Sequence, residues 1–364
     1  ETLERTINAI WRVYSSSKNT KFSSIEIEFQ RELENLLQIK NTRSSDWISH
    51  FSSLLLQIKN KYGDILPPLI YAEFLIEYAE FIAAVDIAQE ELSKDLDESV
   101  FEFSQSLYES AITRARENKD KERLALFTIK YGDFLNKNRQ FHLVGDQCEK
   151  AITIYKKLIS GDSDYLQGEY ASALHLYGNY YYNISEFKMA ERYYNEAYEI
   201  RSRLSEADPE KYEHELAKTI NNLANLYKRQ NNIDRARKLY EESLRLREQC
   251  TERNPQLYEF DKASSLYNIG SLYMKLDRYD EAITYVQKAL EIEERLVERS
   301  PEVYEYLHSY SNTLETLSHL YYIQDDYSKA EQLCQIAISN IEGLVQKNQK
   351  GFGLERGIGH RQIL

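Results

Sequence analysis

Residues 216–246 read LAKTINNLANLYKRQNNIDRARKLYEESLRL, and this stretch decides the fold. Apolar residues recur in it at steps of three or four, which is the spacing of one face of an amphipathic helix. The first stripe consists of Ala217, Ile220, Leu223, Ala224 and Tyr227. A polar break follows at Asn231-Asn232, and a second apolar stripe then runs from Ile233 to Leu246. The stretch therefore predicts two helices joined by a short turn.

A short motif within this stretch occurs four times along the chain. It has an apolar residue, a small residue directly after it, an aromatic residue three positions later and an alanine nine positions after the aromatic. The small residues are Gly178, Ala224, Gly270 and Ser318, at successive steps of 46, 46 and 48 residues. A fixed period of this size is typical of proteins built from stacked repeats. Glycine costs about 1 kcal/mol in a helix, so its use at this slot predicts close packing of the two helices of a repeat.

The connections between the units repeat as well. A capping residue followed by proline recurs every 46 residues, at Asp208-Pro209, Asn254-Pro255 and Ser300-Pro301. Asp, Asn and Ser are preferred helix N-caps, and proline is tolerated in the first helical turn. We therefore predict that each of these pairs starts the first helix of the next repeat.

These residues resemble the tetratricopeptide repeat family, whose standard period is about 34 residues. The period of about 46 in this chain is similar to that of the long-helix repeats of kinesin light chains and of bacterial tetratricopeptide regulators. The resemblance is specific over about residues 165–344. It implies an all-α, right-handed α-solenoid (a superhelix) of tandem antiparallel helix pairs. It also implies a scaffold that binds protein or peptide in its concave groove and has no catalytic activity.

The motif decays towards the N-terminus, and this decay suggests how the chain is organised. We expect five segments: an N-terminal helical cap or adaptor at 1–64, a divergent helix pair at 65–119, a degenerate unit at 120–164, a core of four long-helix repeats at 165–344 and a flexible glycine-rich tail at 345–364. In the degenerate unit, Val144 replaces the alanine of the motif.

Composition argues against several classes of function. The net charge of −13 argues against a nucleic-acid backbone as the main partner, because such sites need a basic field. The longest apolar stretch, residues 65–88, contains four acidic residues, so we expect no membrane-spanning segment. Three cysteines form no disulfide framework, which favours a reducing, cytoplasmic compartment. The first residue is not methionine and the end is glycine-rich, so we expect a covalently attached domain that is missing from this chain.

No set of residues typical of catalysis or metal binding occurs in the sequence. There is no HExxH motif, no Cys/His cluster with zinc spacing, no G-x-S-x-G elbow and no Walker loop. Glu315 and His319 share a helix face, where a solvated pair is the preferred interpretation over a metal site. We therefore expect no catalytic residue, no metal and no cofactor.

The resemblance places a defined set of residues in the concave groove. They come from the first helices of three repeats and are His175, Asn179, Lys218, Asn221, Asn222, Asn225, Lys228, Arg229, Tyr267 and Asn268. Asparagine can both donate and accept hydrogen bonds, which suits an extended peptide backbone. Lysine and arginine suit a carboxylate. We therefore predict a protein or extended peptide partner that is acidic or bears a carboxylate; the alternative is a solvated helix face without a ligand.

A second hypothesis keeps this binding surface but gives the chain a regulatory role. The chain would then be the sensor or regulatory arm of a larger multidomain signalling protein or enzyme, such as a protease or an NTPase switch. A free-standing enzyme is disfavoured because no acid, base or nucleophile set converges. An RNA-binding solenoid is disfavoured by the acidic charge.

Overall fold

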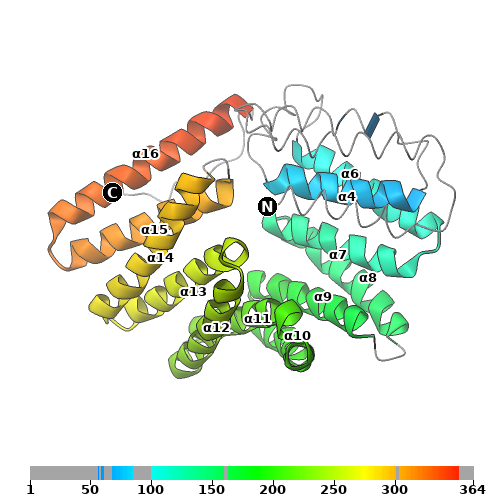
Figure 1. Cartoon of the computed structure of the whole chain (residues 1–364), viewed down its shortest axis with the longest axis horizontal. Helices are drawn as coiled ribbons and strands as arrows, with labels where there is room; N and C mark the ends of the chain where they lie inside the picture. The colour runs from blue at the N-terminus through cyan, green and yellow to red at the C-terminus, as the bar shows by residue number, and fades with distance from the viewer. Residues whose placement is uncertain are drawn as a thin grey trace.

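In the computed structural model of the chain, the described residues are 68–84, 100–159, 163–300 and 303–351, together with residues 56, 59 and 60. These residues form α-helices joined by short turns, and no strand occurs among them (Figure 1). The predicted all-α fold is therefore confirmed. Apart from residues 56, 59 and 60, the expected cap at 1–64 lies outside the described residues, and so do residues 352–364 of the expected tail.

The helices pack in consecutive pairs, and each pair packs on the next. In chain order the pairs are α4 (Pro68–Ala84) with α6 (Val100–Glu117), α7 (Lys121–Lys137) with α8 (Phe141–Leu158), α9 (Asp164–Asn183) with α10 (Phe187–Ala207), α11 (Pro209–Arg229) with α12 (Ile233–Arg253), α13 (Pro255–Lys275) with α14 (Tyr279–Arg299), and α15 (Tyr304–Ile323) with α16 (Tyr327–Gly351). This is the predicted solenoid of helix pairs. The predicted break at residues 231–232 separates α11 from α12, and α16 continues into the range 345–364 that we expected to be a tail.

The turns within the five pairs from α7 to α16, and the turn between α6 and α7, share one backbone feature. Each of six turns contains a single non-glycine residue in the left-handed region, with φ between 55° and 65°. These residues are Lys119, Arg139, Ser185, Asn231, Asp277 and Asp325. In the α11–α12 turn, the residue after Asn231 donates its backbone N–H to the carbonyl of Tyr227 at 2.9 Å, which closes the end of α11. Four of the six stand 46 residues apart (139, 185, 231 and 277), so the turn repeats with the same period as the helices.

The small residues of the motif lie where the two helices of a pair touch. A Cβ atom added to Gly270 would lie 2.5 Å from Cγ2 of Val286, and one added to Gly178 would lie 2.5 Å from Cδ1 of Tyr194. Ala224 and Ala236 of the second copy are completely buried. The predicted close packing at these slots is therefore confirmed.

Two of the three predicted helix starts are confirmed, at Pro209 and Pro255, but only one of them has a side-chain cap. Asp208 caps α11 through its side chain, which accepts a hydrogen bond from the N–H of Lys211 at 3.3 Å. Asn254 makes no such bond, although α13 begins directly after it. Ser300 ends α14, and α15 begins only at Tyr304, so the predicted start at Ser300 is wrong.

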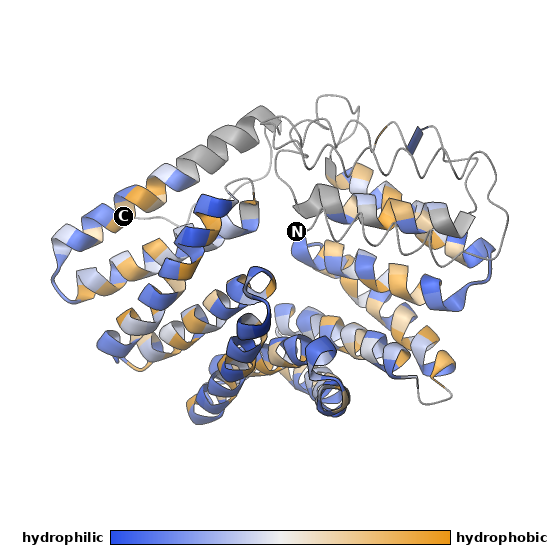
Figure 2. Ribbon diagram, in the orientation of Figure 1, coloured by the Kyte–Doolittle hydropathy of each residue, from blue (hydrophilic) through white to orange (hydrophobic). Residues whose placement is uncertain are grey.

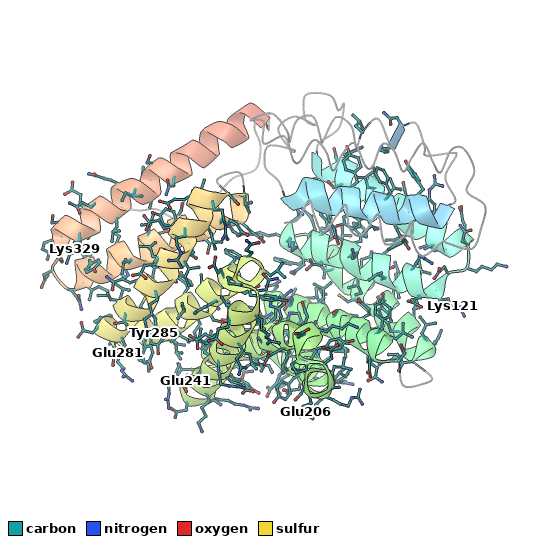
Figure 3. The ribbon with its side chains drawn as sticks, viewed as in Figure 1. Lys121, Glu206, Glu241, Glu281, Tyr285 and Lys329 are labelled. Carbon is teal, nitrogen blue, oxygen red and sulfur yellow. The ribbon has the colours of Figure 1, made fainter. Side chains whose placement is uncertain are left out.

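The pairs follow one another around an arc (Figure 1). We call α7, α9, α11, α13 and α15 the first helices and α8, α10, α12, α14 and α16 the second helices. First helices also contact one another, since α7 touches α9, α9 touches α11 and α11 touches α13. Four labelled residues of second helices, Glu206, Glu241, Glu281 and Lys329, lie around the outer rim in Figure 3. Figure 2 shows most of α12 as hydrophilic, as expected for an outer helix.

Candidate functional site

Polar side chains join the first helices of successive pairs, and we call this set the polar ladder. Its rungs are Asn183 Nδ2 to Asn136 Oδ1 at 3.1 Å, Asn222 Nδ2 to His175 Nε2 at 3.2 Å, Asn268 Nδ2 to Asn221 Oδ1 at 3.1 Å, and the hydroxyls of Tyr267 and Thr316 at 3.1 Å. In the first three rungs the donor stands 47 residues after the acceptor. The ladder therefore follows the period of the repeat, on the side where first helices contact one another.

The rung between α9 and α11 is the most extensively bonded. Asn222 also donates from Nδ2 to Oδ1 of Asn179 at 2.8 Å, and the hydroxyl of Tyr194 donates to the same oxygen at 2.8 Å. On the other side of the ring, Nδ1 of His175 lies 3.2 Å from Oγ1 of Thr219. One connected network thus runs from Thr219 through His175 and Asn222 to Asn179.

His175 is buried, with only 4% of its surface exposed. Burial lowers the pKa of His175 well below its usual value of 6.5, and the positive charges of Arg201 and Lys218 lower it further against the opposing effect of Glu215. The imidazole is therefore neutral near pH 7.

A buried arginine supports this network from the second helix α10. Arg201 is 2% exposed and donates to Oγ1 of Thr219 at 2.6 Å, to the carbonyl of Glu215 at 3.0 Å and to Oγ of Ser172 at 3.1 Å. It also forms an ion pair with the carboxylate of Glu215 at 2.7 Å. The arginine therefore ties α10 to both neighbouring first helices.

The same arrangement recurs one repeat later. Arg247, 3% exposed, donates to the carbonyl of Asp261 and to Oγ of Ser265, the latter at 3.0 Å. One repeat further, the same slot holds Glu293, which is fully buried and accepts a hydrogen bond from Ser309 at 2.5 Å. The junction between α14 and α15 therefore lacks the arginine of the two preceding junctions.

Cations gather at the ends of α11 and α13. Lys228 is half-buried and donates from Nζ to Oγ of Ser271 at 3.3 Å, and Lys275 donates from Nζ to the carbonyl of Lys228 at 2.9 Å. Burial, followed by the charge of Lys275, lowers the pKa of Lys228 to about 8. Among the residues that the structure describes, neither lysine has a carboxylate within 4.0 Å. Within the described part of the chain, the charges of the two lysines therefore have no compensating carboxylate.

The predicted groove residues fall into two groups. Six of the ten belong to the polar ladder or bond directly to it: His175, Asn179, Asn221, Asn222, Tyr267 and Asn268. Of the others, Asn225 accepts a hydrogen bond from the hydroxyl of Tyr240, and Lys228 bonds to Ser271 of the next first helix. Lys218 and Arg229 are exposed, and the guanidinium of Arg229 lies 5.5 Å from the ring centre of Tyr182.

The buried arginines that support the ladder from the second helices were not identified from the sequence. Arg201 lies on a second helix, outside the positions considered for the groove. A signal was available, because the combination of Arg201 with Thr219 recurs 46 residues later as Arg247 with Ser265. A buried charge repeated with the period of the fold indicates a shared structural partner.

The described residues contain no group of three or more His, Cys, Asp or Glu side chains that could hold a metal ion. Glu315 and His319 are both exposed on α15. Within the same residues, no helix has the length and apolar character needed to span a membrane. The three cysteines are free thiols, and two of them, Cys148 and Cys250, are buried.

Three segments of the chain match family models described as tetratricopeptide repeat. The matched residues are 171–203, 216–249 and 263–296. They contain the first three copies of the motif and the rungs of the polar ladder between α9 and α13. No curated protein matches the chain.

Solved structures of the same fold cover nearly the whole chain. The apo form of RapI has a TM-score of 0.58 at 13% identity, over 88% of this chain and 99% of that one. NprR in complex with its cognate peptide NprX has a TM-score of 0.55 at 14% identity, over 97% and 90%. Aspartyl phosphate phosphatase F from Bacillus subtilis has a TM-score of 0.50 at 14% identity, over 98% and 97%. At these identities the likeness shows a shared fold.

Proposed function

Because the chain is a tetratricopeptide repeat protein, we propose that the polar ladder of its first helices binds an extended segment of another polypeptide. The observation that carries this proposal is the combination of amides and cations on one side of three successive first helices. Amides can bond to both groups of a peptide backbone. The proposal is supported by one structure of the same fold, NprR, which was solved with a bound peptide.

The two lysines beside the ladder indicate the chemistry of the bound segment. Lys228 and Lys275 have no carboxylate partner among the described residues, and the charge of Lys275 disfavours the ammonium form of Lys228. A carboxylate placed between them would relieve this repulsion and form charge-assisted hydrogen bonds. We therefore expect an acidic segment, or one that ends in a carboxylate beside these lysines.

We propose no catalytic activity for this chain. The matched family models describe repeats. One structure of the same fold is a phosphatase, but at 14% identity it shows only the fold. The function proposed here is that of a protein-interaction scaffold.

The test is selection of ligands from a random peptide library on the intact chain. Enriched peptides should be acidic, and their affinity should fall as salt rises, because exposed charges are screened. Asn225→Ala combined with Lys228→Glu should weaken binding at least tenfold, which corresponds to about 1.4 kcal/mol.

The matched control is Lys238→Glu, which makes the same charge change at an exposed position of the second helix α12. It should leave affinity within about twofold of the parent, or roughly 0.4 kcal/mol. Lys238→Glu should keep the parental melting temperature. Asn225→Ala removes the acceptor of the buried Tyr240 hydroxyl, so affinities are compared well below the melting temperature of the double variant. Equal binding by the double variant and the parent would show that the segment does not contact Asn225 and Lys228 beside the ladder, and would overturn the proposed binding surface.

A further inference from the structure

The hydrogen bonds of Asn222 determine the protonation of His175. An amide nitrogen only donates, so Nε2 of His175, at 3.2 Å, must accept. The ring proton of the neutral imidazole then resides on Nδ1 and is donated to Thr219. Thr219 is able to accept it, because its own hydroxyl hydrogen is donated to the carbonyl of Glu215 at 3.1 Å. The structure therefore holds the Nδ1–H tautomer of His175.

The hydrogen bonds of the two asparagines also determine which of their side-chain atoms can still bind a ligand. Asn222 uses both hydrogens of Nδ2, on His175 and on Asn179, so its Oδ1 remains an acceptor. Asn179 uses both lone pairs of Oδ1, on Asn222 and on Tyr194, so its Nδ2 remains a donor. Neither remaining atom has a partner among the described residues, and both side chains are half-buried.

We propose that His175 is a positioning residue that orients the amides of Asn222 and Asn179, so that the pair offers one acceptor and one donor to the N–H and C=O groups of a single residue of an extended chain, which point to the same side. The inference rests on the function proposed above and names the part of the ligand that this rung reads. That part is the backbone, so recognition at this rung is independent of the ligand's side chains.

The tautomer of His175 matters because the donors and acceptors of the network can exchange roles. If Nε2 carried the proton, it would donate to an oxygen of Asn222, and that amide would have to turn. Asn179 would then turn with it, because its oxygen could no longer accept from Asn222. The pair would offer the opposite atoms at the same places. The network behind the ring decides the direction, through the hydroxyl of Thr219 and the guanidinium of Arg201.

The charged groups that face His175 also favour the neutral ring. Arg201 from α10 and Lys218 from α11 disfavour an imidazolium, and Glu215 from α11 opposes them. The Tyr194 ring of α10 covers the imidazole, with 5.6 Å between ring centres. Protonation of the ring would supply a donor at Nε2 and reverse Asn222, so the orientation holds only while His175 is neutral.

A second rung repeats two of these hydrogen bonds without histidine. Each residue of the first rung has a counterpart 46 positions later: Asn221 for His175, Asn225 for Asn179, Asn268 for Asn222 and Tyr240 for Tyr194. Asn268 donates to Oδ1 of Asn221 at 3.1 Å, and Tyr240 donates to Oδ1 of Asn225. An amide oxygen therefore replaces the imidazole nitrogen as the acceptor. The second rung indicates that His175→Asn is a conservative substitution and that an apolar residue is not.

The first arm of the test uses the free protein. Nitrogen NMR of the labelled chain should show His175 as the Nδ1–H tautomer near pH 7, with slowly exchanging side-chain amide hydrogens on Asn222. On acidification, protonation of the ring and a change at the Asn222 amide should occur together. An Nε2–H tautomer, or an Asn222 amide that does not respond, would overturn the proposal.

The second arm uses the tightest acidic peptide from the library and versions in which each peptide N–H in turn is replaced by an ester oxygen. In the parent, one ester should weaken binding about tenfold, or about 1.4 kcal/mol. His175→Asn should keep this penalty, and His175→Leu should lose it while retaining the parental melting temperature. A penalty of the same size at the same bond in His175→Leu would overturn the proposal.

The two arms separate failure of this inference from failure of the proposed function. If no library peptide binds, the proposed function fails, and the recognition of a ligand residue's N–H and C=O groups fails with it. The NMR arm would still decide whether His175 orients Asn222. If peptides bind and the ester penalty is insensitive to His175, the proposed function stands and the inference fails.

Discussion

We expect Gly270→Ala to destabilise the pair of α13 and α14, although helix propensity alone predicts the opposite. Replacing an interior helical glycine with alanine contributes about 1 kcal/mol of stability. The new Cβ would, however, lie 2.5 Å from Cγ2 of Val286 and 3.2 Å from the carbonyl oxygen of Ala282. Val286 is branched at Cβ and has little rotamer freedom in a helix. The carbonyl belongs to the backbone of α14, so relief requires the two helices to separate.

The magnitude follows from the two opposing effects. Overpacking a well-packed core costs about 1–3 kcal/mol, and subtraction of the propensity gain leaves a loss of about 0–2 kcal/mol. The matched background is Val286→Ala, which removes the clashing methyl group. There the added Cβ should fit, and Gly270→Ala should stabilise by up to about 1 kcal/mol. The two substitutions should therefore show a coupling free energy of about 1 kcal/mol or more, as expected for residues in contact.

Hydrogen exchange of the α13 and α14 amides measures this coupling within the repeat itself. Exchange is preferable to a single global transition, because the stability of a solenoid is a sum over repeats and their interfaces. Protection factors should fall in Gly270→Ala and recover in the double variant relative to Val286→Ala. If Gly270→Ala raises protection equally in both backgrounds, the clash is not real and the slot has room for a side chain.

Two further predictions concern buried charges. Arg201→Met removes the guanidinium that bonds Thr219 and Glu215. It should lower the free energy of unfolding by about 3 kcal/mol. This is the lower end of the cost of breaking a buried ion pair, because Glu215 remains partly hydrated. Urea titration at an unchanged m-value measures it, and a loss below about 1 kcal/mol would show that water replaces the arginine. In the folded chain the pKa of Lys228 is about 8, against a usual value of 10.5. Between pH 8 and pH 10.5 the unfolded chain therefore binds more protons than the folded chain. The free energy of unfolding should rise with pH across this range. Lys228→Met should abolish this rise and the exposed Lys218→Met should keep it; a rise that survives in Lys228→Met would assign it to another group.

The helix pairs could be predicted from the sequence because their causes are local and repeated. The apolar stripes and the break at Asn231-Asn232 are properties of one segment, and the glycine at position 270 reports a contact within one pair. The helix starts were less predictable. At Ser300 the capping residue ends α14, and α15 begins four residues later at Tyr304. A capping residue between two helices can serve either of them, and only the packing of both helices decides which.

The candidate site shows a different limit. Helical spacing correctly assigned His175 and Asn221 to the first helices, but both side chains are buried, because the next first helix packs over them. Burial of this kind depends on the distance between repeats, which no single repeat encodes. Arg201 was missed for the same reason, since its partners Ser172 and Thr219 belong to two different first helices.

The repeat that builds the solenoid also determines the spacing at which successive rungs would contact a bound chain. Packed helices lie about 8–10 Å apart, and an extended chain advances about 3.3–3.6 Å per residue, so successive rungs should meet a ligand roughly three residues apart. Asn222 belongs to one rung and Asn268, 46 positions later, to the next. In the ester series, a second sensitive bond should therefore appear about three residues from the first. His175→Leu should remove the penalty at the first bond and leave the second, because Asn221 holds Asn268 independently of His175. If both penalties vanish together, His175 acts by distorting the whole array; if only one bond is ever sensitive, the second rung does not read the ligand.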